Sequence, residues 1–339
     1  MKPLEALNRL NDIAIGYAFS QTLFTACKLN LFETLSNGPL TAEELSRKIA
    51  IHPEPCRAFL MTLNLLGLVE REQERYRNSE VAEFLTSKSK IPLEPISMWG
   101  DPFYHMWEFL PDALRERSPR WQQAVGTTAA ETFAAIYEDP ARLRRFTQFM
   151  SAYGTAIGQE IAERFDFTPH RCVMDVAGGP GGFSIQIGLK HPHLRGIIMD
   201  LPPVCKLAEE SIQAYGLGGR FTAVPADLFS GPYPAGADVM ILSWILHDWS
   251  DDNCRKIIEN CFAALPSGGV LLISESVLNN DSSGKAFALF MSLHMLLANE
   301  PGAGERSEVE YRSLLKEAGF QDVELLRLDA PRDLIVARK

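Results

Sequence analysis

One stretch of the chain combines an apolar run, an acid and a cluster of glycines: VMDVAGGPGGF, residues 173–183. Glycines let the backbone turn sharply and let a ligand approach main-chain N–H groups. The pattern is typical of the first strand, the turn and the first helix of a nucleotide-binding α/β domain. Because glycine-rich turns also end ordinary strands, a purely structural turn remains an alternative for this stretch taken alone.

Acids and one histidine follow the later apolar runs in the same way. Asp200 ends the run 196–200, about 20 residues after the glycines, where dinucleotide-binding folds place an acid that accepts hydrogen bonds from ribose hydroxyls. Asp227 ends the next run, and the run 237–243 leads into His247. An imidazole titrates near neutral pH, so this histidine is a candidate general base. Polar residues at the carboxyl ends of successive strands predict a ligand site at that edge of an open α/β sheet.

Strand-like and helix-like patterns alternate from residue 171 onward. The predicted strands lie near 171–176, 195–199, 220–224, 237–243, 268–275, 321–327 and 332–338. The predicted helices lie near 182–190, 203–215, 251–265, 285–298 and 307–318. The last two strands have so short a connection that they must run antiparallel. The predicted fold class is α/β, with a Rossmann-like, mostly parallel sheet and a C-terminal antiparallel hairpin.

The first half of the chain has a different organisation. Residues 1 to about 35 show long helical periodicity, and Thr41 and Glu44 have the spacing of a capping box. An apolar helical pattern over 56–66 is followed by a short hairpin near 68–77. Helix, turn, helix and hairpin predict a winged-helix arrangement. DNA recognition by the second helix is one interpretation, but that helix is too apolar to read a groove and looks buried, which favours a small core or dimerisation domain.

We expect three parts in the chain. Residues 1–90 form a helical and winged-helix dimerisation domain, residues 91–165 a helical linker that contributes to a substrate pocket, and residues 166–339 the catalytic domain. A helix over 139–164 is predicted to link the two halves. The segment 92–125 is rich in aromatic residues and prolines. Most aromatic residues are simply core, but this density between two domains favours a pocket for a flat apolar ligand.

The composition excludes several classes of protein. Of 339 residues, 46% are hydrophobic and 22% charged, and the formal net charge of -10 argues against sequence-nonspecific nucleic-acid binding. No apolar run reaches the roughly 18 residues that span a bilayer, and the N-terminus lacks the layout of a signal peptide. Six cysteines without metal-ligand spacing predict reduced thiols and a cytoplasmic protein. His191 and His193 flank a proline, where a solvated loop is favoured over a metal pair, so no metal site is predicted.

Five motifs occur in order and give the chain a family likeness. They are DVAGGPG at 175–181, DLP at 200–202, ADLF at 226–229, HDWSD at 247–251 and GERS at 304–307, the last before a helix that ends in AGF. Together they resemble the S-adenosylmethionine-dependent O-methyltransferases that include plant caffeate, flavonoid and hydroxyindole enzymes and bacterial enzymes that tailor aromatic natural products. The resemblance implies a methyltransferase sheet, S-adenosylmethionine as cofactor, a small aromatic hydroxylated substrate and a homodimer. The charge and the lack of a long apolar run lead us to expect neither nucleic acid nor membrane as partner.

The resemblance also implies roles for individual residues. His247 matches the catalytic base, and Glu275 and Glu305 match two acids that orient it. The residues expected to bind the cofactor are Gly178, Gly179, Gly181, Asp200, Leu201, Asp227, Leu228, Ser243, Trp244, Asp248, Trp249 and Ser151. The residues expected to line the substrate pocket are Met150, Phe146, Phe103, Trp107, Phe290, Met291 and His294.

The sequence departs from the family pattern at three places. Ala177 stands where a glycine is usual, which narrows the turn slightly. Ser243 stands where plant members carry a lysine near the adenine, so that contact is absent or different. The segment between Met295 and Glu305 is longer than in many bacterial relatives, which loosens the alignment on the substrate side and with it the role of His294.

A histidine base restricts the kind of acceptor. The pKa of a phenol is near 10 and that of an imidazole near 6.5, so full proton transfer before methylation would cost about 5 kcal/mol. That cost suits a base acting as the new bond forms, and it favours a phenolic or enolic hydroxyl over an aliphatic alcohol. A buried carboxylate pair would raise its own pKa or that of the base. The alternatives are an N- or C-methyltransferase of the same fold, a ligand-sensing winged-helix regulator and an NAD-dependent dehydrogenase.

Overall fold

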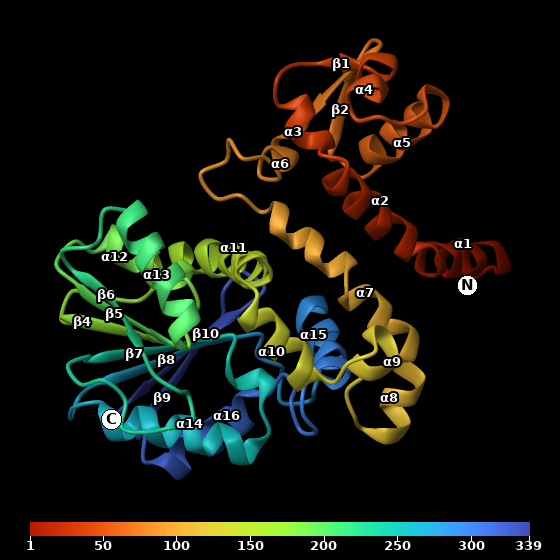
Figure 1. The fold of residues 1–339 in the computed structure, drawn as a ribbon. Coiled ribbons are helices and arrows are strands. Elements are labelled where there is room, and N and C mark those ends of the chain that lie inside the picture. The colour runs from red at the N-terminus through yellow and green to blue at the C-terminus, as the bar shows by residue number, and fades with distance from the viewer. The chain divides into compact units, whose positions relative to one another are not determined.

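The computed structural model describes all 339 residues, which form two compact units, Met1–His105 and Met106–Lys339. Figure 1 shows the course of the chain through each of them. None of the helices combines the length and the apolar character needed to cross a membrane. The finer division that the sequence suggests, with boundaries at residues 90 and 165, stays a prediction.

The first unit is mainly helical and carries a small antiparallel sheet. Its helices are α1 (Pro3–Ala14), α2 (Gly16–Lys28), α3 (Leu31–Leu35), α4 (Ala42–Lys48), α5 (Pro53–Leu65), α6 (Glu80–Glu83) and the 3-10 helix η1 (Glu94–Gly100), and α7 (Phe103–Met106) begins at its end. Its strands are β1 (Leu40–Thr41), β2 (Val69–Glu72) and β3 (Arg75–Asn78), in the order β1-β3-β2. Helices α4 and α5 followed by the β2–β3 hairpin give the helix, turn, helix and hairpin that the sequence predicts.

The predicted helical stretch over residues 1–35 is divided into three helices. Asn30 has left-handed backbone with φ 53° and separates α2 from α3. Helix α1 buries none of its residues. Its Leu4, Leu7 and Leu10 side chains are each more than half exposed. Since residues three apart lie on the same face of a helix, these leucines form an apolar stripe that the rest of the first unit leaves uncovered.

Helices α4 and α5 show how far local patterns predict structure. The Glu44 N–H donates to the Thr41 hydroxyl, and the Thr41 N–H donates to the Glu44 carboxylate, which confirms the predicted capping box at the start of α4. Helix α5 buries Cys56, Leu60 and Leu63. Leu65 on the same helix is 75% exposed. The prediction that this helix is buried is therefore wrong for one of its faces.

The second unit is built on a seven-stranded sheet. Its strands are β4 (Cys172–Val176), β5 (Arg195–Asp200), β6 (Phe221–Pro225), β7 (Val239–Ser243), β8 (Val270–Glu275), β9 (Asp322–Leu326) and β10 (Asp333–Arg338). Its helices are α8 (Leu110–Glu116), α9 (Trp121–Val125), α10 (Ala129–Glu138), α11 (Pro140–Arg164), α12 (Gly182–Lys190), α13 (Pro202–Ala214), α14 (Asp251–Ala264), α15 (Ala286–Ala298) and α16 (Glu308–Ala318), with the 3-10 helices η2 (Trp107–Phe109) and η3 (Leu246–Asp248). The strand order is β6-β5-β4-β7-β8-β10-β9, parallel from β6 to β8, with β10 antiparallel to both of its neighbours. This confirms the predicted fold class.

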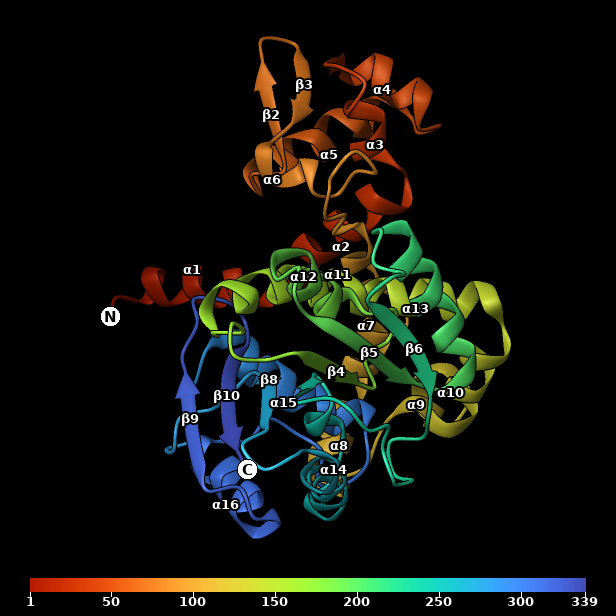
Figure 2. The same ribbon diagram turned by 90° about the vertical axis from the view of Figure 1, so that its left-hand side faces the viewer.

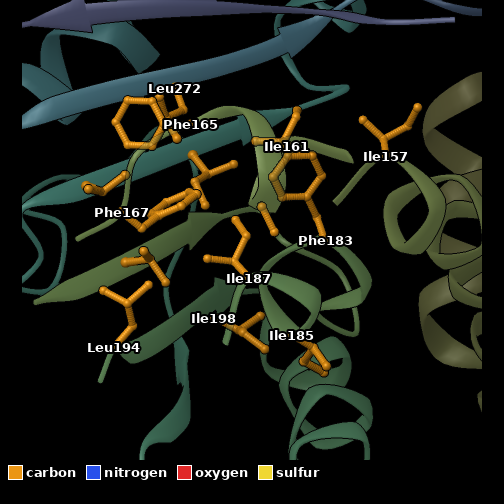
Figure 3. Packing of buried hydrophobic residues seen from close by; sticks show 14 of the residues in the cluster. Ile157, Ile161, Phe165, Phe167, Phe183, Ile185, Ile187, Leu194, Ile198 and Leu272 are labelled. Atoms are coloured by element: carbon orange, nitrogen blue, oxygen red, sulfur yellow. The ribbon is translucent and has the colours of Figure 1, made fainter. Parts of the chain in front are cut away.

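Helices cover both faces of this sheet, as Figures 1 and 2 show. Side chains alternate between the faces along each strand. In β8, Val270 and Leu272 pack with the layer that contains α11, α12 and α13, whereas Leu271 and Ile273 pack with α14 and α16. Figure 3 shows the first layer, in which Phe183 of α12 lies among the side chains between helices and sheet. Strands buried on both faces read as continuous apolar runs, which is why the sequence locates them well.

Helix α11 confirms the prediction over 139–164 and packs closely on α12. A Cβ atom at Gly158 would lie 2.6 Å from the carbonyl oxygen of Phe183, and one at Gly154 would lie 3.3 Å from the nitrogen of the same residue. Only glycine permits this approach of helix to backbone. Because α12 begins at the end of the glycine-rich loop, the contact also holds that loop in place.

Candidate active site

The glycine-rich loop connects β4 to the N-terminus of α12. Ala177, Gly179 and Gly181 have positive φ angles of 54°, 58° and 83°. Glycine adopts left-handed backbone without a steric penalty, whereas an alanine does so against its own Cβ. The departure at Ala177 therefore falls on a position where the backbone itself favours glycine.

Asp200 ends β5 and lies against this loop. Its Oδ2 accepts a hydrogen bond from the Gly179 N–H and its Oδ1 accepts one from the Leu201 N–H, both at 2.7 Å. Burial raises the pKa of Asp200, and these two N–H donors oppose the rise. A carboxylate has about four lone-pair positions. Both oxygens therefore keep the capacity to accept hydrogen bonds from a ligand's hydroxyl groups.

The loop fits a cofactor that approaches the backbone closely. A Cβ atom at Gly178 would lie 2.5 Å from Asp175 Cγ, and one at Gly181 would lie 2.2 Å from Ile198 Cδ1. At Gly179 the same atom would meet nothing within 4 Å. Tight packing behind two glycines and open space beside the third form a cradle that a ligand can enter.

His247 lies in η3, which follows β7 at the same edge of the sheet. Its ring is 3% exposed, and its Nδ1 is 2.8 Å from Glu305 Oε1. Its Nε2 is 3.5 Å from Asp248 Oδ1. The Gly304 N–H donates to the His247 carbonyl oxygen at 2.9 Å. The loop that carries Glu305 therefore holds both the ring and the backbone of His247, and it leaves Nε2 as the nitrogen that faces away from Glu305.

Glu275 reaches the same segment from the end of β8. Its Oε1 accepts hydrogen bonds from the Ile245 N–H at 3.0 Å and the Leu246 N–H at 2.9 Å. Its Oε2 has no hydrogen-bond partner and lies 3.9 Å from His247 Nδ1. Strands β7 and β8 are neighbours, which confirms the prediction that Glu275 ends a strand beside that of His247. Glu275 thus fixes the backbone before the histidine and adds a negative charge near its ring.

The carboxylates around His247 control its charge. Burial lowers the pKa of the imidazole, but Glu275, Asp248 and Glu305 together outweigh burial and raise the pKa of His247 to about 10. Burial raises the pKa of Glu275 to about 7, although the charged histidine opposes that rise. At neutral pH His247 is therefore protonated in this structure. The direction agrees with the effect that the sequence leads us to expect of a buried carboxylate pair.

The donor atoms of this cluster would also suit a divalent metal ion. One atom each from His247, Glu275 and Glu305 lie within 4.8 Å of one another. The 2.8 Å contact between His247 Nδ1 and Glu305 Oε1 is a hydrogen-bond distance, too short for an ion to lie between the two atoms. We interpret the cluster as a site that holds a proton.

Ser243 and Trp244 connect the end of β7 to a buried arginine. The Ser243 hydroxyl accepts a hydrogen bond from Arg332 Nη1 at 2.8 Å. The Trp244 ring stacks on the His247 ring with 5.6 Å between centroids, and Arg332 Cζ lies 4.8 Å from the centroid of the same indole. Trp244 has positive φ, 59°. The residue that contacts the Ser243 hydroxyl in this chain is therefore the buried Arg332.

The other predicted cofactor residues follow the strands or lie on α11. Those after β6 and β7 are at least partly exposed: Asp227, Leu228 and Trp249. The Trp249 ring lies edge-on to that of Phe229, 4.7 Å away, which brings it to the segment that carries Asp227. Ser151 lies against Gly182, where a Cβ atom would be 2.4 Å from the serine hydroxyl. The structure therefore places Ser151 beside the glycine-rich loop.

Three of the predicted substrate residues form a stack of parallel rings. Trp107 and Phe290 are 5.1 Å apart at 7°, and Phe290 and His294 are 5.9 Å apart at 10°. Burial lowers the pKa of His294 to about 3, with a smaller contribution from the charge of His247, so His294 is neutral. Met291, next to Phe290 on α15, is buried.

The remaining predicted substrate residues come from two places in the chain. Phe146 and Met150 are half-buried on consecutive turns of α11, and the Phe146 ring packs edge-on against Phe133 at 5.8 Å. Phe103 belongs to the first unit, where its buried ring lies 5.4 Å from that of Trp99.

Several polar residues of the site escaped the sequence analysis: Arg306, Asn299 and Arg332. Arg306 donates to the carbonyl oxygens of Leu246 at 2.8 Å and Trp249 at 2.7 Å. It therefore holds together the two ends of the short segment that contains His247. Asn299 donates to Asp248 Oδ1. Arg306 stands in the GERS motif and could have been found there. Nothing in the local pattern marks Asn299 or Arg332.

The histidines on either side of Pro192 each contact a backbone carbonyl oxygen. His191 Nε2 lies 2.8 Å from the carbonyl oxygen of Ala162, and His193 Nε2 lies 3.1 Å from that of Phe167. Each ring therefore has its own hydrogen-bond partner in the backbone.

Comparison with known proteins identifies relatives over nearly the whole chain. A family model described as an O-methyltransferase domain matches residues 107–321, and one described as an O-methyltransferase dimerisation domain matches residues 11–88. A 3-hydroxy-5-methyl-1-naphthoate 3-O-methyltransferase of Streptomyces sahachiroi is 35% identical, with 95% of this chain and 92% of that protein covered. The N,N-dimethyltransferase OxyT of Streptomyces rimosus is 31% identical, with 97% and 95% covered. The crystal structure of human N-acetylserotonin methyltransferase in complex with S-adenosylmethionine matches with a TM-score of 0.90 and 30% identity, over 98% of this chain and 97% of that one.

Proposed function

Because the chain belongs to the O-methyltransferase family, we propose that it transfers a methyl group from S-adenosylmethionine to a phenolic or enolic hydroxyl of a small aromatic compound, with His247 as the general base. One observation carries this proposal. His247 is buried at the carboxyl end of β7, with Nδ1 held by Glu305 at 2.8 Å and Glu275 beside it. An imidazole fixed through one nitrogen by a carboxylate is suited to take a proton at the other nitrogen.

The residues that would hold the cofactor are those of the cradle. Asp200 would accept hydrogen bonds from the ribose hydroxyls, Gly178, Gly179 and Gly181 would surround the methionine part, and Asp227 would hold the adenine. S-adenosylmethionine is the cofactor of this family, and it supplies a methyl group already activated by a positively charged sulfur. The protein has only to position the acceptor and to remove its proton.

His247 removes that proton through Nε2 while Nδ1 stays on Glu305. Since the pKa of His247 is raised to about 10, transfer from a phenol is close to thermoneutral, in place of about 5 kcal/mol uphill to a free imidazole. The cost moves to an earlier step, because His247 must first lose the proton it carries at neutral pH. A positive charge bound next to His247 favours that loss.

The aromatic stack supports a flat acceptor. Trp107 and Phe290 lie parallel and are both half-buried. Parallel rings of this kind stack well on a planar ligand. An aromatic acceptor also has the acidic hydroxyl that a histidine base requires.

We also propose that the chain acts as a homodimer. The first unit matches a dimerisation-domain model, and its helix α1 leaves Leu4, Leu7 and Leu10 exposed. Contiguous exposed apolar side chains are typical of interaction sites. Light scattering on the purified protein should give twice the chain mass at micromolar concentration, and a monomer mass under those conditions would contradict the proposal.

Methylation at nitrogen is the second candidate. It is favoured by the 31% identity to the N,N-dimethyltransferase OxyT. An uncharged amine can attack before it loses a proton, so it depends less on a general base than a phenol does. The His247 variant therefore separates the two functions.

The proposed function is tested by combining two classes of methyl acceptor with a variant of His247. The protein is incubated with labelled S-adenosylmethionine and either catechol-type phenols or aromatic amines of the same ring skeleton, and products are identified by mass. We expect methylated phenols, and a fall in kcat of about 10²- to 10⁴-fold in His247→Gln. Binding of S-adenosylhomocysteine by that variant, measured by calorimetry, should persist.

The matched control is His193→Gln, which changes an exposed histidine and should leave the rate unchanged. Wild-type rates on phenols in His247→Gln would refute the role of the base. Methylation of the amines alone would favour the second candidate.

A further inference from the structure

The proton that His247 removes must leave the site before the next turnover. The His247 ring is 3% exposed, and its Nδ1 faces Glu305 at 2.8 Å and Glu275 at 3.9 Å. The side chains of both glutamates are 0% exposed. A proton passed to either of them would therefore stay inside the protein.

Asp248 is the carboxylate on the other side of the ring. Its Oδ1 lies 3.5 Å from His247 Nε2, and its side chain is 38% exposed. Groups that exchange a proton are often this far apart in a resting site and approach each other during the reaction. Asp248 thus combines a position beside the nitrogen that faces away from Glu305 with access to solvent, which neither glutamate has.

Asn299 holds Asp248 in this position. Its Nδ2 donates to Asp248 Oδ1 at 2.5 Å. Asn299 follows the last residue of α15, and the next residue, Glu300, accepts a hydrogen bond from the Ser250 N–H at 2.6 Å. Two consecutive residues therefore tie the segment 248–250 to the end of α15. Because an amide carries no charge, Asn299 orients the carboxylate without neutralising it.

The other titratable groups around this pair come from several elements. Those that face Asp248 or His247 are Glu275 of β8, Glu305 of the loop before α16, Tyr137 of α10 and His294 of α15. Burial raises the pKa of Tyr137 to about 12, so its hydroxyl stays protonated, and His294 is neutral. Burial also raises the pKa of Asp248, against the charge of His247 and the Asn299 N–H.

We propose that Asp248, held by Asn299, is the exit for the proton that His247 takes from the methyl acceptor. The proposal rests on the function proposed above. The Nε2–H bond of the imidazolium breaks, an O–H bond forms on the Asp248 carboxylate, and the proton then passes to water. His247 returns to the neutral imidazole and Asp248 to the carboxylate, so both are ready for the next acceptor.

This transfer is fast enough although the imidazolium holds its proton strongly. The pKa of His247 is about 10 and the usual pKa of an aspartate is about 4, so the proton favours His247 by at most about 10⁶-fold. The raised pKa of Asp248 makes that factor smaller. Dividing a prefactor of about 6 × 10¹² s⁻¹ by about 10⁶ leaves about 10⁶ to 10⁷ transfers per second, far above a typical kcat of about 10 s⁻¹.

The test measures how fast the Nε2 proton of His247 exchanges with water. Protein labelled with ¹⁵N-histidine is observed by NMR at neutral pH as wild type and as Asp248→Asn, and the His247 signals are identified by their absence in His247→Gln. We expect exchange of the Nε2 proton to slow by about tenfold in Asp248→Asn. Formate, a small soluble carboxylate, should restore the exchange, whereas chloride at the same ionic strength should not.

The direction of the change separates a proton exit from a simple charge effect. Loss of a negative charge beside His247 lowers the pKa of the imidazole, which by itself would speed the loss of its proton. Slower exchange in Asp248→Asn therefore indicates that a proton carrier has been removed. The Nδ1 proton, held by Glu305, provides an internal reference that should not slow.

Three further variants complete the comparison. Asp248→Glu keeps a carboxylate and should exchange faster than Asp248→Asn. Asp252→Asn makes the same change at an aspartate whose side chain is 88% exposed, and it should leave the exchange unchanged. Should Asp248→Asn fail to fold, Asn299→Ala keeps the carboxylate but removes the group that holds it, and it should slow the exchange by about threefold.

Turnover provides a second readout. The protein is first equilibrated with S-adenosylmethionine, and the acceptor is then added. The first turnover of Asp248→Asn should keep about the wild-type rate, because proton release follows methyl transfer. Later turnovers should be about tenfold slower than in wild type, and formate should restore them.

Exchange of the Nε2 proton at the wild-type rate or faster in folded Asp248→Asn, or no response to formate, would overturn the proposal. Equal slowing of the first and later turnovers would also overturn it. The exchange measurement needs no methyl acceptor. Wild-type turnover in His247→Gln would therefore defeat the proposed function while leaving the exchange result valid.

Discussion

Replacing Glu305 with glutamine removes one charge from the contact that holds the His247 ring and keeps the size of the side chain. Glu305 Oε1 lies 2.8 Å from His247 Nδ1, and both side chains are almost fully buried. At an effective dielectric constant of 20, two unit charges at that distance attract by about 6 kcal/mol, which is an upper limit because desolvation opposes it. A close opposite charge raises a pKa by about 1 to 3 units in practice, or about 1.4 to 4 kcal/mol.

We therefore expect the pKa of His247 to fall from about 10 by about 1 to 3 units in Glu305→Gln. The glutamine carbonyl can still accept a hydrogen bond from Nδ1–H, so the orientation of the ring is kept while stabilisation of the imidazolium is lost. The optimum of kcat should move to lower pH, and its maximum should drop about 10²-fold. Titration of ¹⁵N-histidine by NMR and a pH series of initial rates measure the two effects.

The matched control is Glu310→Gln, which removes a carboxylate that accepts hydrogen bonds from Ser307 in the capping box of α16. It should lower Tm slightly and leave the His247 titration in place. A Glu305→Gln protein whose His247 titrates within about 0.3 units of wild type would show that the 2.8 Å contact does not control the base, and the reasoning about its charge would be refuted.

Three further outcomes follow from the geometry. Asp200→Asn should weaken binding of S-adenosylhomocysteine by about 1.5 to 3 kcal/mol in calorimetry, because the amide has one acceptor oxygen fewer than the carboxylate and no charge for the ribose hydroxyls to bond to. An affinity equal to wild type would show that Asp200 does not bind the ligand. Gly158→Ala should lower the free energy of unfolding by about 1 to 3 kcal/mol in urea, because its Cβ would meet the Phe183 carbonyl oxygen at 2.6 Å, whereas Gly16→Ala, which meets nothing within 4 Å, should not destabilise. The pKa of His247 is raised on folding, so its ionic contribution to stability is complete below about pH 6.5 and is lost as pH rises through 10. The difference in free energy of unfolding between wild type and His247→Gln should therefore shrink from pH 7 to pH 10. A difference that grows over that range would contradict the raised pKa of His247.

The local patterns of the sequence were sufficient to predict most of the helices and strands of the second unit. The apolar runs of β4 to β8, the glycine-rich loop and the capping box at Thr41 each depend on residues close together in the chain, and all were placed within a few residues. Asp200 and His247 could also be named in advance, because strand ends in a parallel sheet fall at one edge, whereas Glu275 was named from the family resemblance.

The sequence did not predict which faces of the helices are buried. The apolar pattern over 56–66 suggested a buried helix, yet Leu65 is exposed. Periodicity shows that a helix has an apolar face, but it does not say whether the same chain or another surface covers that face.

The sequence by itself determined the alternation of strands and helices and the cradle of glycines, and it singled out the histidine that we propose as the base, since each follows from backbone conformation or side-chain chemistry within a short segment. Only the tertiary structure decided the charge state of that histidine. The pKa of His247 depends on Glu275 from β8, Asp248 from η3 and Glu305 from a distant loop, which meet only when the chain folds. Electrostatic energy depends on distance and burial in space, and neither is written in the order of residues along the chain.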